Sequence, residues 1–402
     1  MRCITTSLVW LALFSPLTAA EAPLVEKYLH SGQLARGEQV MEAALSSTPV
    51  NDELRLSLAV VQLVRGVERL GQALYEYGCL PEQQDRPLLR IPVPRNPDPT
   101  PVTYSAFRRV LDAFRSDLAT VESTLAGVKA EDVKLPLKLA GIRVDLTGKG
   151  DARERFDEIL IRLLGPGFHL AADNPEFLVC LDRGDVAWLR AYCHLLMALI
   201  DLNLAFDLEP EFHLTADRLF ANPKRRFEGT PEEKRKAEDE VWQFYKIVEP
   251  ARLSRFGRHF VEVCKLNRET WKFIRAETDN DHEWLPNPDQ TGVLRMPVTN
   301  QMIDSWLSMV EEVERLFEGE RVIPASVIQF LFAQTKTGKT GLNYRTFLDD
   351  PPDEIDRRRV QKNGVRDKYL DGSHRDLDLS SFLRVMTTFQ DTLAVGYAAW
   401  FN

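Results

Sequence analysis

Three side chains with acid–base chemistry share one face of the most apolar helix that the sequence predicts. The helix covers residues 185–206. At roughly 100° per residue, Arg190, His194 and Asp201 fall within about 40° of one another. A histidine that a carboxylate orients can act as a general base, so these are our candidate catalytic residues.

The same stripe has a second interpretation, a buried ion network between helices. A buried charge must be paired or hydrogen-bonded, and Arg190, His194 and Asp201 could pair with neighbouring helices. An enzyme of a familiar hydrolase type would also need a nucleophile, and the sequence has no GxSxG motif and no Cys–His pair of known spacing. We therefore favour the network.

A histidine and a glutamate with ligand chemistry, His259 and Glu262, lie three residues apart on another predicted helix. Metal-binding helical bundles use Glu-x-x-His on each of two helices, whereas here the order is reversed and no second copy exists. The HExxH motif is also absent. We therefore predict that these two residues bind no metal.

Two acid-rich loops carry carboxylates at every second position. Asp279, Asp281 and Glu283 form one series, and Asp376 and Asp378 form the other. Calcium loops also use alternate oxygen ligands, but they need a glycine at the sixth position and a glutamate at the twelfth, and both loops lack them. We expect these acids to cap helices and turn the chain, and we predict no cofactor.

The segment AQTKTGKT is a formal match to a phosphate-binding loop, from Ala333 to Gly338, Lys339 and Thr340. Such a loop needs a strand before it and a helix that begins at the Lys-Thr pair. The residues after Thr340 are poor helix formers, and too little chain follows for the rest of a nucleotide-binding sheet. We interpret the match as spurious, a polar turn after a short buried helix or strand.

The N-terminus has the form of a secretory signal peptide. A single charge, Arg2, precedes a short apolar run, and Thr18 and Ala20 are the small residues before a cleavage site at Glu21. We predict that residues 1–20 are removed and that the mature protein is exported, periplasmic or extracellular, and soluble. No later segment is apolar for long enough to insert in a membrane.

The charge balance argues against nucleic acid as a partner. The 402 residues carry 51 Lys and Arg against 60 Asp and Glu, a net charge of −9. Binding to phosphates needs clustered basic residues. The two basic runs, at 223–226 and 356–362, are expected to be solvated surface. Another protein is the partner that we consider.

Four cysteines remain after cleavage: Cys79, Cys180, Cys193 and Cys264. An oxidising compartment permits disulfides, and the sequence leaves their pairing open. Their spacing is not that of a zinc site. Buried free thiols are an equal alternative, since a core of this size does not need disulfides.

Hydrophobic periodicity predicts a mainly α-helical fold, a multi-helix bundle or array. One small β-hairpin is expected at 133–146, where apolar residues alternate on both sides of a turn. Residues 21–79 form a helical pair, residues 80–103 a proline-rich linker or surface strap, and residues 104–402 the helical body.

The helical pair within residues 24–78 resembles the tetratricopeptide repeat, a helix–turn–helix unit of about 34 residues. The resemblance takes Pro49 as the closing proline. Matching positions are Leu24, Tyr28, Gly37, Met41 and Ala44 in one unit and Leu58, Ala59, Gly71 and Tyr75 in the next. Glu21 stands where the family has tryptophan, and the second unit lacks the proline. The resemblance implies a helix-stacking module that binds a protein partner.

We therefore expect an exported protein with a structural or protein-interaction role. The alternative is a secreted or periplasmic, hydrolase-like enzyme that uses the polar stripe of helix 185–206, closed over by the long loops 279–297 and 333–378. An enzyme should hold the stripe in an open pocket with shifted pKa values, whereas a scaffold should bury it fully paired.

Overall fold

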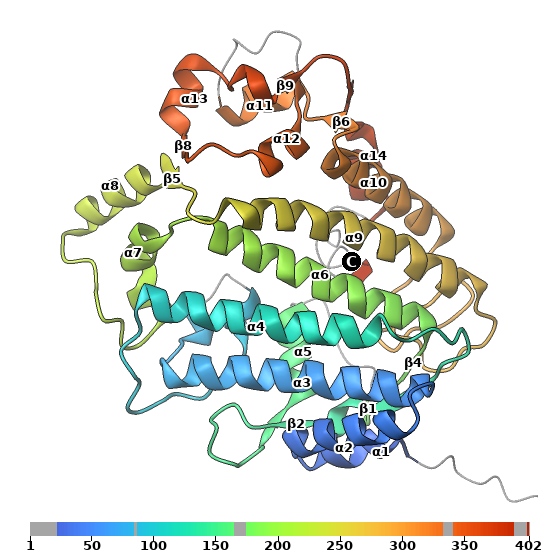
Figure 1. Ribbon diagram of the computed structural model, residues 1–402. Helices are drawn as coiled ribbons and strands as arrows, with labels where there is room; N and C mark the ends of the chain where they lie inside the picture. Colours follow the sequence, from blue (N-terminus) through green and yellow to red (C-terminus); the bar gives the residue numbers. More distant parts are fainter. Residues whose placement is uncertain (1–21, 84–86, 165–173, 333–340, 390–399, 402) are drawn as a thin grey trace, which may run out of the picture.

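Helices lie one beside the next in chain order and form a layer (Figure 1). The computed structural model describes residues 22–83, 87–164, 174–332, 341–389 and 400–401. The helices of the layer are α1 (Leu24–His30), α2 (Leu34–Ser47), α3 (Asp52–Glu76), α4 (Tyr104–Leu125), α6 (Arg183–Ala205), α9 (Pro250–Ala276), α10 (Asn300–Glu318) and α14 (Leu379–Thr388). The mainly α-helical array that the sequence predicts is confirmed.

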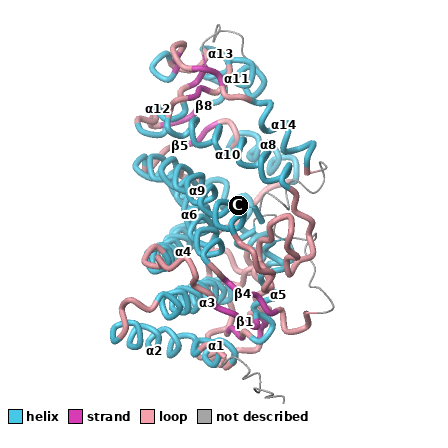
Figure 2. The backbone as a smooth tube through the Cα atoms, turned by 90° about the vertical axis from the view of Figure 1, so that its right-hand side faces the viewer, coloured by secondary structure: helices cyan, strands magenta, loops and turns pink. Residues whose placement is uncertain are grey.

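Further helices and small sheets complete the described part of the chain. The helices are α5 (Phe156–Leu164), α7 (Glu209–Leu219), α8 (Pro231–Val241), α11 (Ala325–Phe332), α12 (Tyr344–Asp349) and α13 (Arg357–Asn363). The paired strands are β1 (Leu135–Lys138) with β4 (Leu178–Leu181), β2 (Arg143–Val144) with β3 (Glu154–Arg155), β5 (Phe244–Lys246) with β8 (Glu354–Asp356), β6 (Arg321–Val322) with β10 (Arg375–Asp376), and β7 (Gly341–Leu342) with β9 (Leu370–Asp371). Figure 2 shows that β1, β4, α5 and many loops lie on one side of the helical layer.

The predicted hairpin at 133–146 does not form, although parts of this segment are strands. β1 pairs antiparallel with β4, so that Leu135 lies opposite Leu181, and β2 pairs with β3. A 3-10 turn at Leu139–Gly141 separates β1 from β2. The alternation identified the buried side chains, among them Leu137. It could not identify the partner strand, and so the predicted pairing was wrong.

Local signals set where α8 and α9 begin. Thr230 and Glu233 form the predicted capping box of α8. Pro250 lies at the first turn of α9, where its missing N–H costs no hydrogen bond. The proline therefore separates the two helices, and β5 lies between them.

The proline-rich segment 80–103 packs against the body. Ile91, Val93 and Val102 are buried, and the N–H of Val102 donates to the carbonyl of Asn222 at 3.0 Å. The described residues of this segment are therefore a surface strap, one of the two predicted alternatives.

The N-terminal helices pack closely because Gly37 has no side chain. A Cβ added there would lie 2.7 Å from Cβ of Tyr28, so a larger residue would push α2 away from α1. α3 then continues from Asp52 to Glu76 without the turn that a second helix–turn–helix unit would contain. The tetratricopeptide resemblance stays a hypothesis.

The end of the chain closes the core. Trp400 and Phe401 are fully buried. The indole N–H of Trp188 donates to the carbonyl of Trp400 at 2.8 Å, and the amide of Asn267 donates to the carbonyl of Phe401 at 2.6 Å. The ring of Trp271 lies 4.5 Å from that of Phe401. These contacts tie α6 and α9 to the last described residues.

The two long loops lie at opposite ends of α6. Near its N-terminal end, the N–H of Cys180 donates to the carbonyl of His282 at 3.2 Å. Near its C-terminal end, Leu348 of α12 packs in a cluster with Ala205 and Phe256. The enzyme alternative requires the two loops to converge over α6. The described parts of the loops do not.

None of the α-helices in the described ranges is long and apolar enough to cross a bilayer. The predicted signal peptide, residues 1–20, lies outside those ranges.

Candidate functional site

The three predicted residues of α6 lie in one continuous network that crosses from α4 to α9. The link between helices is a hydrogen bond between two imidazoles: Nδ1 of His194 lies 2.8 Å from Nδ1 of His259. Arg190 and Asp201 extend the network at its two ends. Residues 65 positions apart in the sequence therefore meet across α6 and α9.

At one end of the network, Glu122 of α4 accepts hydrogen bonds from Arg190. The shorter one joins Nη2 and Oε1 at 2.9 Å, and Nε2 of His194 lies 3.5 Å from the same oxygen. The interaction with His194, and then that with Arg190, lowers the pKa of Glu122 to about 2 although burial opposes the shift. The carboxylate is therefore ionised at neutral pH and balanced by its neighbours.

At the other end, Asp201 is fully buried and faces three arginines. Arg252 Nη1 donates to Oδ1 at 2.8 Å, and Arg255 Nε donates to Oδ2 at 3.2 Å. Arg115 Nε lies 2.9 Å from Oδ1, but its N–H is not aligned for a hydrogen bond. Burial alone would raise the pKa of Asp201, and the arginines outweigh it and lower that pKa.

The second histidine of the network is held in a form that resists protonation. Burial, and then the neighbouring His194, lowers the pKa of His259 to about 4. Nε2 of His259 lies 3.7 Å from Asp201, too far for a hydrogen bond. One Nδ1 of the pair must carry the proton and the other must accept it, because two facing lone pairs or two facing N–H groups would repel each other.

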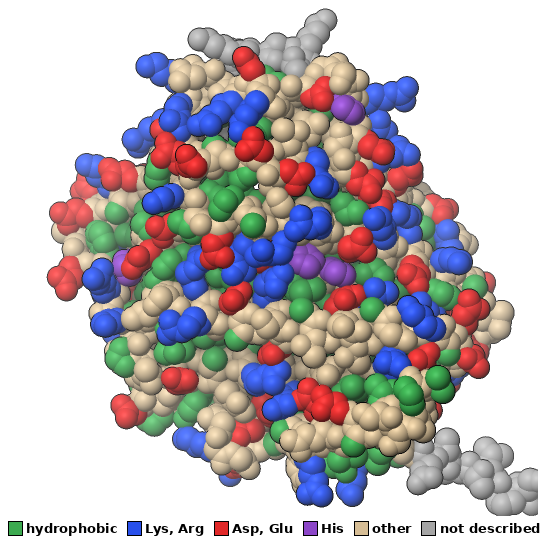
Figure 3. All heavy atoms as spheres, in the orientation of Figure 1, with side chains coloured by type: hydrophobic (Ala, Val, Ile, Leu, Met, Phe, Trp, Pro, Cys, Tyr) green, Lys and Arg blue, Asp and Glu red, His purple; other side chains and the backbone are tan. Residues whose placement is uncertain are grey.

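This network has little of the openness that a catalytic base needs. The side chains of His194 and His259 are only 13% and 15% exposed. Five surface pockets in the described part of the chain are lined by other side chains. Figure 3 shows Lys and Arg side chains gathered across the middle of this face, over α4, α6 and α9, with histidines beside them.

His259 and Glu262, the two residues considered as metal ligands, interact with different groups. His259 belongs to the network, whereas the carboxylate of Glu262 is half exposed and lies 3.4 Å from Nζ of Lys265. The two side chains have separate partners.

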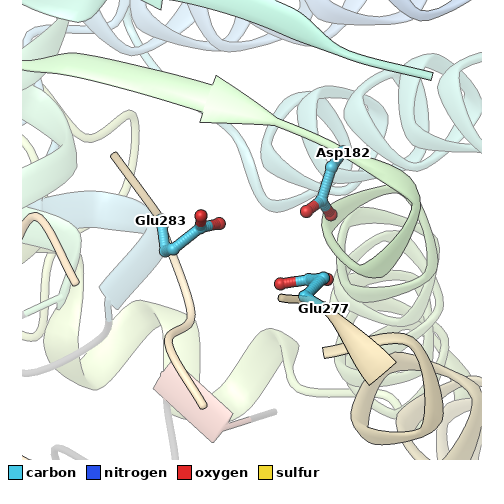
Figure 4. Close-up of side chains that lie close together, drawn as sticks. All are labelled: Asp182, Glu277 and Glu283. Carbon is cyan, nitrogen blue, oxygen red and sulfur yellow. The ribbon is translucent and has the colours of Figure 1, made fainter. Parts of the chain in front are cut away.

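A cluster of three carboxylates at the N-terminal end of α6 was not predicted (Figure 4). Ligand oxygens of Asp182, Glu277 and Glu283 all lie within 4.8 Å of one another. Asp182 is the N-cap of α6, and its Oδ1 accepts from the N–H of Gly184 at 2.8 Å. Glu277 follows the last residue of α9, and Glu283 lies in the loop before α10.

Burial makes full ionisation of this cluster unfavourable. It raises the pKa of Glu277 to about 8, with the charge of Asp182 as the second cause. Burial also raises the pKa of Asp182 and of Glu283. Behind them, burial and then the charge of Asp182 raise the pKa of Asp185 well above its usual range. The cluster therefore retains a proton at neutral pH.

These oxygens are the kind of ligand that calcium prefers, but much of their capacity is already used. Asp182 also caps α6, whose N-terminus carries partial positive charge and repels a cation. Oε1 of Glu283 accepts from the N–H of Asp281 at 2.7 Å. Calcium takes about six to eight oxygen ligands. Asp182, Glu277 and Glu283 are the described residues best placed to hold a cation, and proton sharing satisfies them without one.

The sequence held a partial signal for this cluster. The alternating acids of the loop diverge, since Asp279 and Asp281 both pair with Lys134 and Glu283 turns inward. His282 has φ of 62°, a left-handed conformation that changes the direction of the chain between them. The expectation that these acids only cap and turn the chain therefore misses Glu283. In the other loop, Asp378 caps α14 as expected.

Gly338, Lys339 and Thr340 lie outside the described residues, but the elements on both sides are described. The helix α11 precedes the segment and the strand β7 follows it. A phosphate-binding loop has the opposite order, strand and then helix. The surrounding elements thus give no support to a nucleotide site here.

The four cysteines in the described part of the chain are free and buried. Burial raises the pKa of each thiol, Cys79, Cys180, Cys193 and Cys264, to about 12. Because the thiolate is the nucleophile, these thiols are unreactive at neutral pH.

Comparisons with protein-family models, with curated proteins and with solved structures found no match for this chain.

Proposed function

We propose that this chain is an exported protein with a structural or protein-interaction role, and that the helical layer presents a charged face to a partner. The support is the bonding of the stripe on which an enzyme would depend. Arg190 is bonded to Glu122, His194 to His259, and Asp201 to arginines of α9. A catalytic group must keep a polar atom available for its substrate, whereas the polar atoms of these side chains bind other groups of the protein.

Export is supported by the N-terminal pattern of Arg2, the apolar run and the small residues before Glu21. Its test is expression of the full chain in a bacterial host, followed by fractionation and N-terminal sequencing. We expect a mature N-terminus at Glu21 in the exported fraction. Retention of Met1 in the cytoplasm would contradict export.

The non-enzymatic role is tested with the wild-type protein and the His194→Gln variant. Both are assayed on generic ester, peptide, phosphoester and glycoside substrates, with His374→Gln as control because the His374 side chain is exposed. We expect no turnover that depends on His194. Turnover that disappears in His194→Gln and persists in His374→Gln would show that the network is an active site.

A further inference from the structure

The side of the helical layer that lies away from strands β1 and β4 carries a band of arginines. Strands and loops pack on the other side of the layer (Figure 2), whereas basic side chains gather on this side over α4, α6 and α9 (Figure 3). The fold assembles the band from residues that are dispersed in the sequence. The arginine band consists of arginines that pair with carboxylates around the network, namely Arg108, Arg115, Arg190, Arg252 and Arg255, and of Arg258, whose charge acts on His259.

The arginine band has more positive than negative charge. The carboxylates that pair with its arginines are Asp112, Glu122, Asp201 and Glu249. Six guanidinium groups face four carboxylates, so two positive charges remain, in a protein whose net charge is −9. This local positive charge is opposite in sign to the net charge of the protein. It can therefore attract an acidic partner that the rest of the surface repels.

The excess charge is accessible at Arg255 and Arg258. Arg255 is 33% exposed and shares the single carboxylate of Asp201 with two other arginines. Arg258 is exposed and forms no ion pair within the described ranges, and its charge contributes to the lowered pKa of His259. Because a guanidinium has five N–H donors, both side chains retain donors for an incoming acceptor.

We propose that the arginine band docks a carboxylate-rich peptide segment of a partner protein, a proposal that rests on the interaction role above and gives its partner a chemistry. The planar guanidinium matches a carboxylate with two parallel hydrogen bonds, and Asp201 shows that the band already binds carboxylate. An excess of two charges is too small to hold nucleic acid against the repulsion of a protein at −9.

The experiment measures binding of a fluorescent peptide rich in glutamate to the purified protein by anisotropy at low ionic strength. The variant Arg255→Glu/Arg258→Glu reverses the two accessible charges. The matched control, Arg225→Glu/Arg226→Glu, makes the same charge change at an exposed site in the basic run 223–226. We expect the first variant to weaken binding by at least about tenfold and the control by less than about twofold, with wild-type binding lost as salt rises.

Two further arms keep the result interpretable. Arg258→Glu alone changes a side chain that forms no ion pair with the described residues, so the variant should fold and should still weaken binding. A single-stranded oligonucleotide replaces the peptide in a parallel titration. The proposal is overturned by equal loss in both double variants, by no wild-type binding at low salt, or by tighter binding of the oligonucleotide. None of these outcomes shows whether the protein is an enzyme. The activity assay tests that separately, because it does not involve the peptide.

Discussion

His194 and His259 face each other through Nδ1 atoms 2.8 Å apart and so share one proton between α6 and α9. Glu122 lies on the outer side of the first ring, 3.5 Å away, and Asp201 on the outer side of the second, 3.7 Å away. The positively charged groups near the pair are arginines of α4, α6 and α9: Arg115, Arg190 and Arg258. Protonation of both Nδ1 atoms would place two N–H groups face to face, so full protonation of the pair is unfavourable in the folded protein.

The first prediction concerns acid stability. The pKa of His259 is about 4 in the folded protein and about 6.5 in an unfolded chain, so between these values the unfolded chain binds more protons. The contribution of His259 is therefore present above about pH 6.5 and is lost as pH falls towards 4. Melting temperatures measured across this window should fall less steeply in His259→Gln than in the wild type.

The control for that measurement is His374→Gln, which removes an exposed histidine outside the network. It should keep the wild-type slope. If the His259→Gln and wild-type curves run parallel from pH 7 to pH 4, the shared proton has no energetic consequence.

The second prediction concerns Asp201, whose single carboxylate serves Arg115, Arg252 and Arg255. Asp201→Asn leaves three guanidinium groups without their shared anion. Removal of one partner from a buried ion pair is strongly destabilising, and because Arg115 and Arg255 are partly exposed we expect a loss of about 2–4 kcal/mol. Urea unfolding measures the loss. Glu262→Gln, at a half-exposed site, should change stability by less than about 0.5 kcal/mol.

The parts of the network that could be predicted are those on one helix. The 3.6-residue period of α6 places Arg190, His194 and Asp201 on one stripe, and a buried stripe must find partners. A similar stripe on α4, with Arg115 and Glu122 seven residues apart, was open to the same argument. The pairing of His194 with a residue of α9 could not be predicted in this way, since it depends on how the two helices are placed along each other.

The carboxylate cluster shows more clearly what could not be predicted from the sequence. Asp182 precedes α6 and Glu277 follows α9, with α7 and α8 between those two helices. The sequence contains nothing that places the end of α9 beside the start of α6. The acids at 279–283 did indicate a loop with oxygen ligands. Which of them turns inward is decided by the left-handed backbone at His282, which the residue type does not specify, and by the pairing of Lys134 with Asp279, which is a tertiary contact.

The third prediction concerns alkaline stability. The pKa of Glu277 is raised to about 8, whereas an unfolded chain releases this proton near pH 4.5. Between these values the folded protein binds more protons, so the contribution of Glu277 is full below about pH 4.5 and is lost as pH rises to 8. Glu277→Gln keeps a donor for Asp182 without this loss. Its melting temperature should equal that of the wild type near pH 4.5 and exceed it at pH 8.

The comparison for Glu277→Gln is Glu318→Gln, at the exposed last residue of α10. It should leave the wild-type profile unchanged. A Glu277→Gln protein that is less stable than the wild type at pH 8 would mean that this carboxylate is ionised and bound by a cation.

The fourth prediction separates a proton from a metal ion in the same cluster. Asp182 spends an oxygen on the N-terminus of α6 and Glu283 spends one on a backbone N–H, so too few oxygens remain for the six to eight that calcium takes. The chelator EDTA should leave the melting temperature unchanged at pH 7. Calcium at about 1 mM, a concentration near the dissociation constants of extracellular calcium sites, should raise the melting temperature by less than about 1 °C. Elemental analysis should find no stoichiometric metal. A larger shift with calcium that is absent in Glu277→Gln would instead establish Asp182, Glu277 and Glu283 as cation ligands.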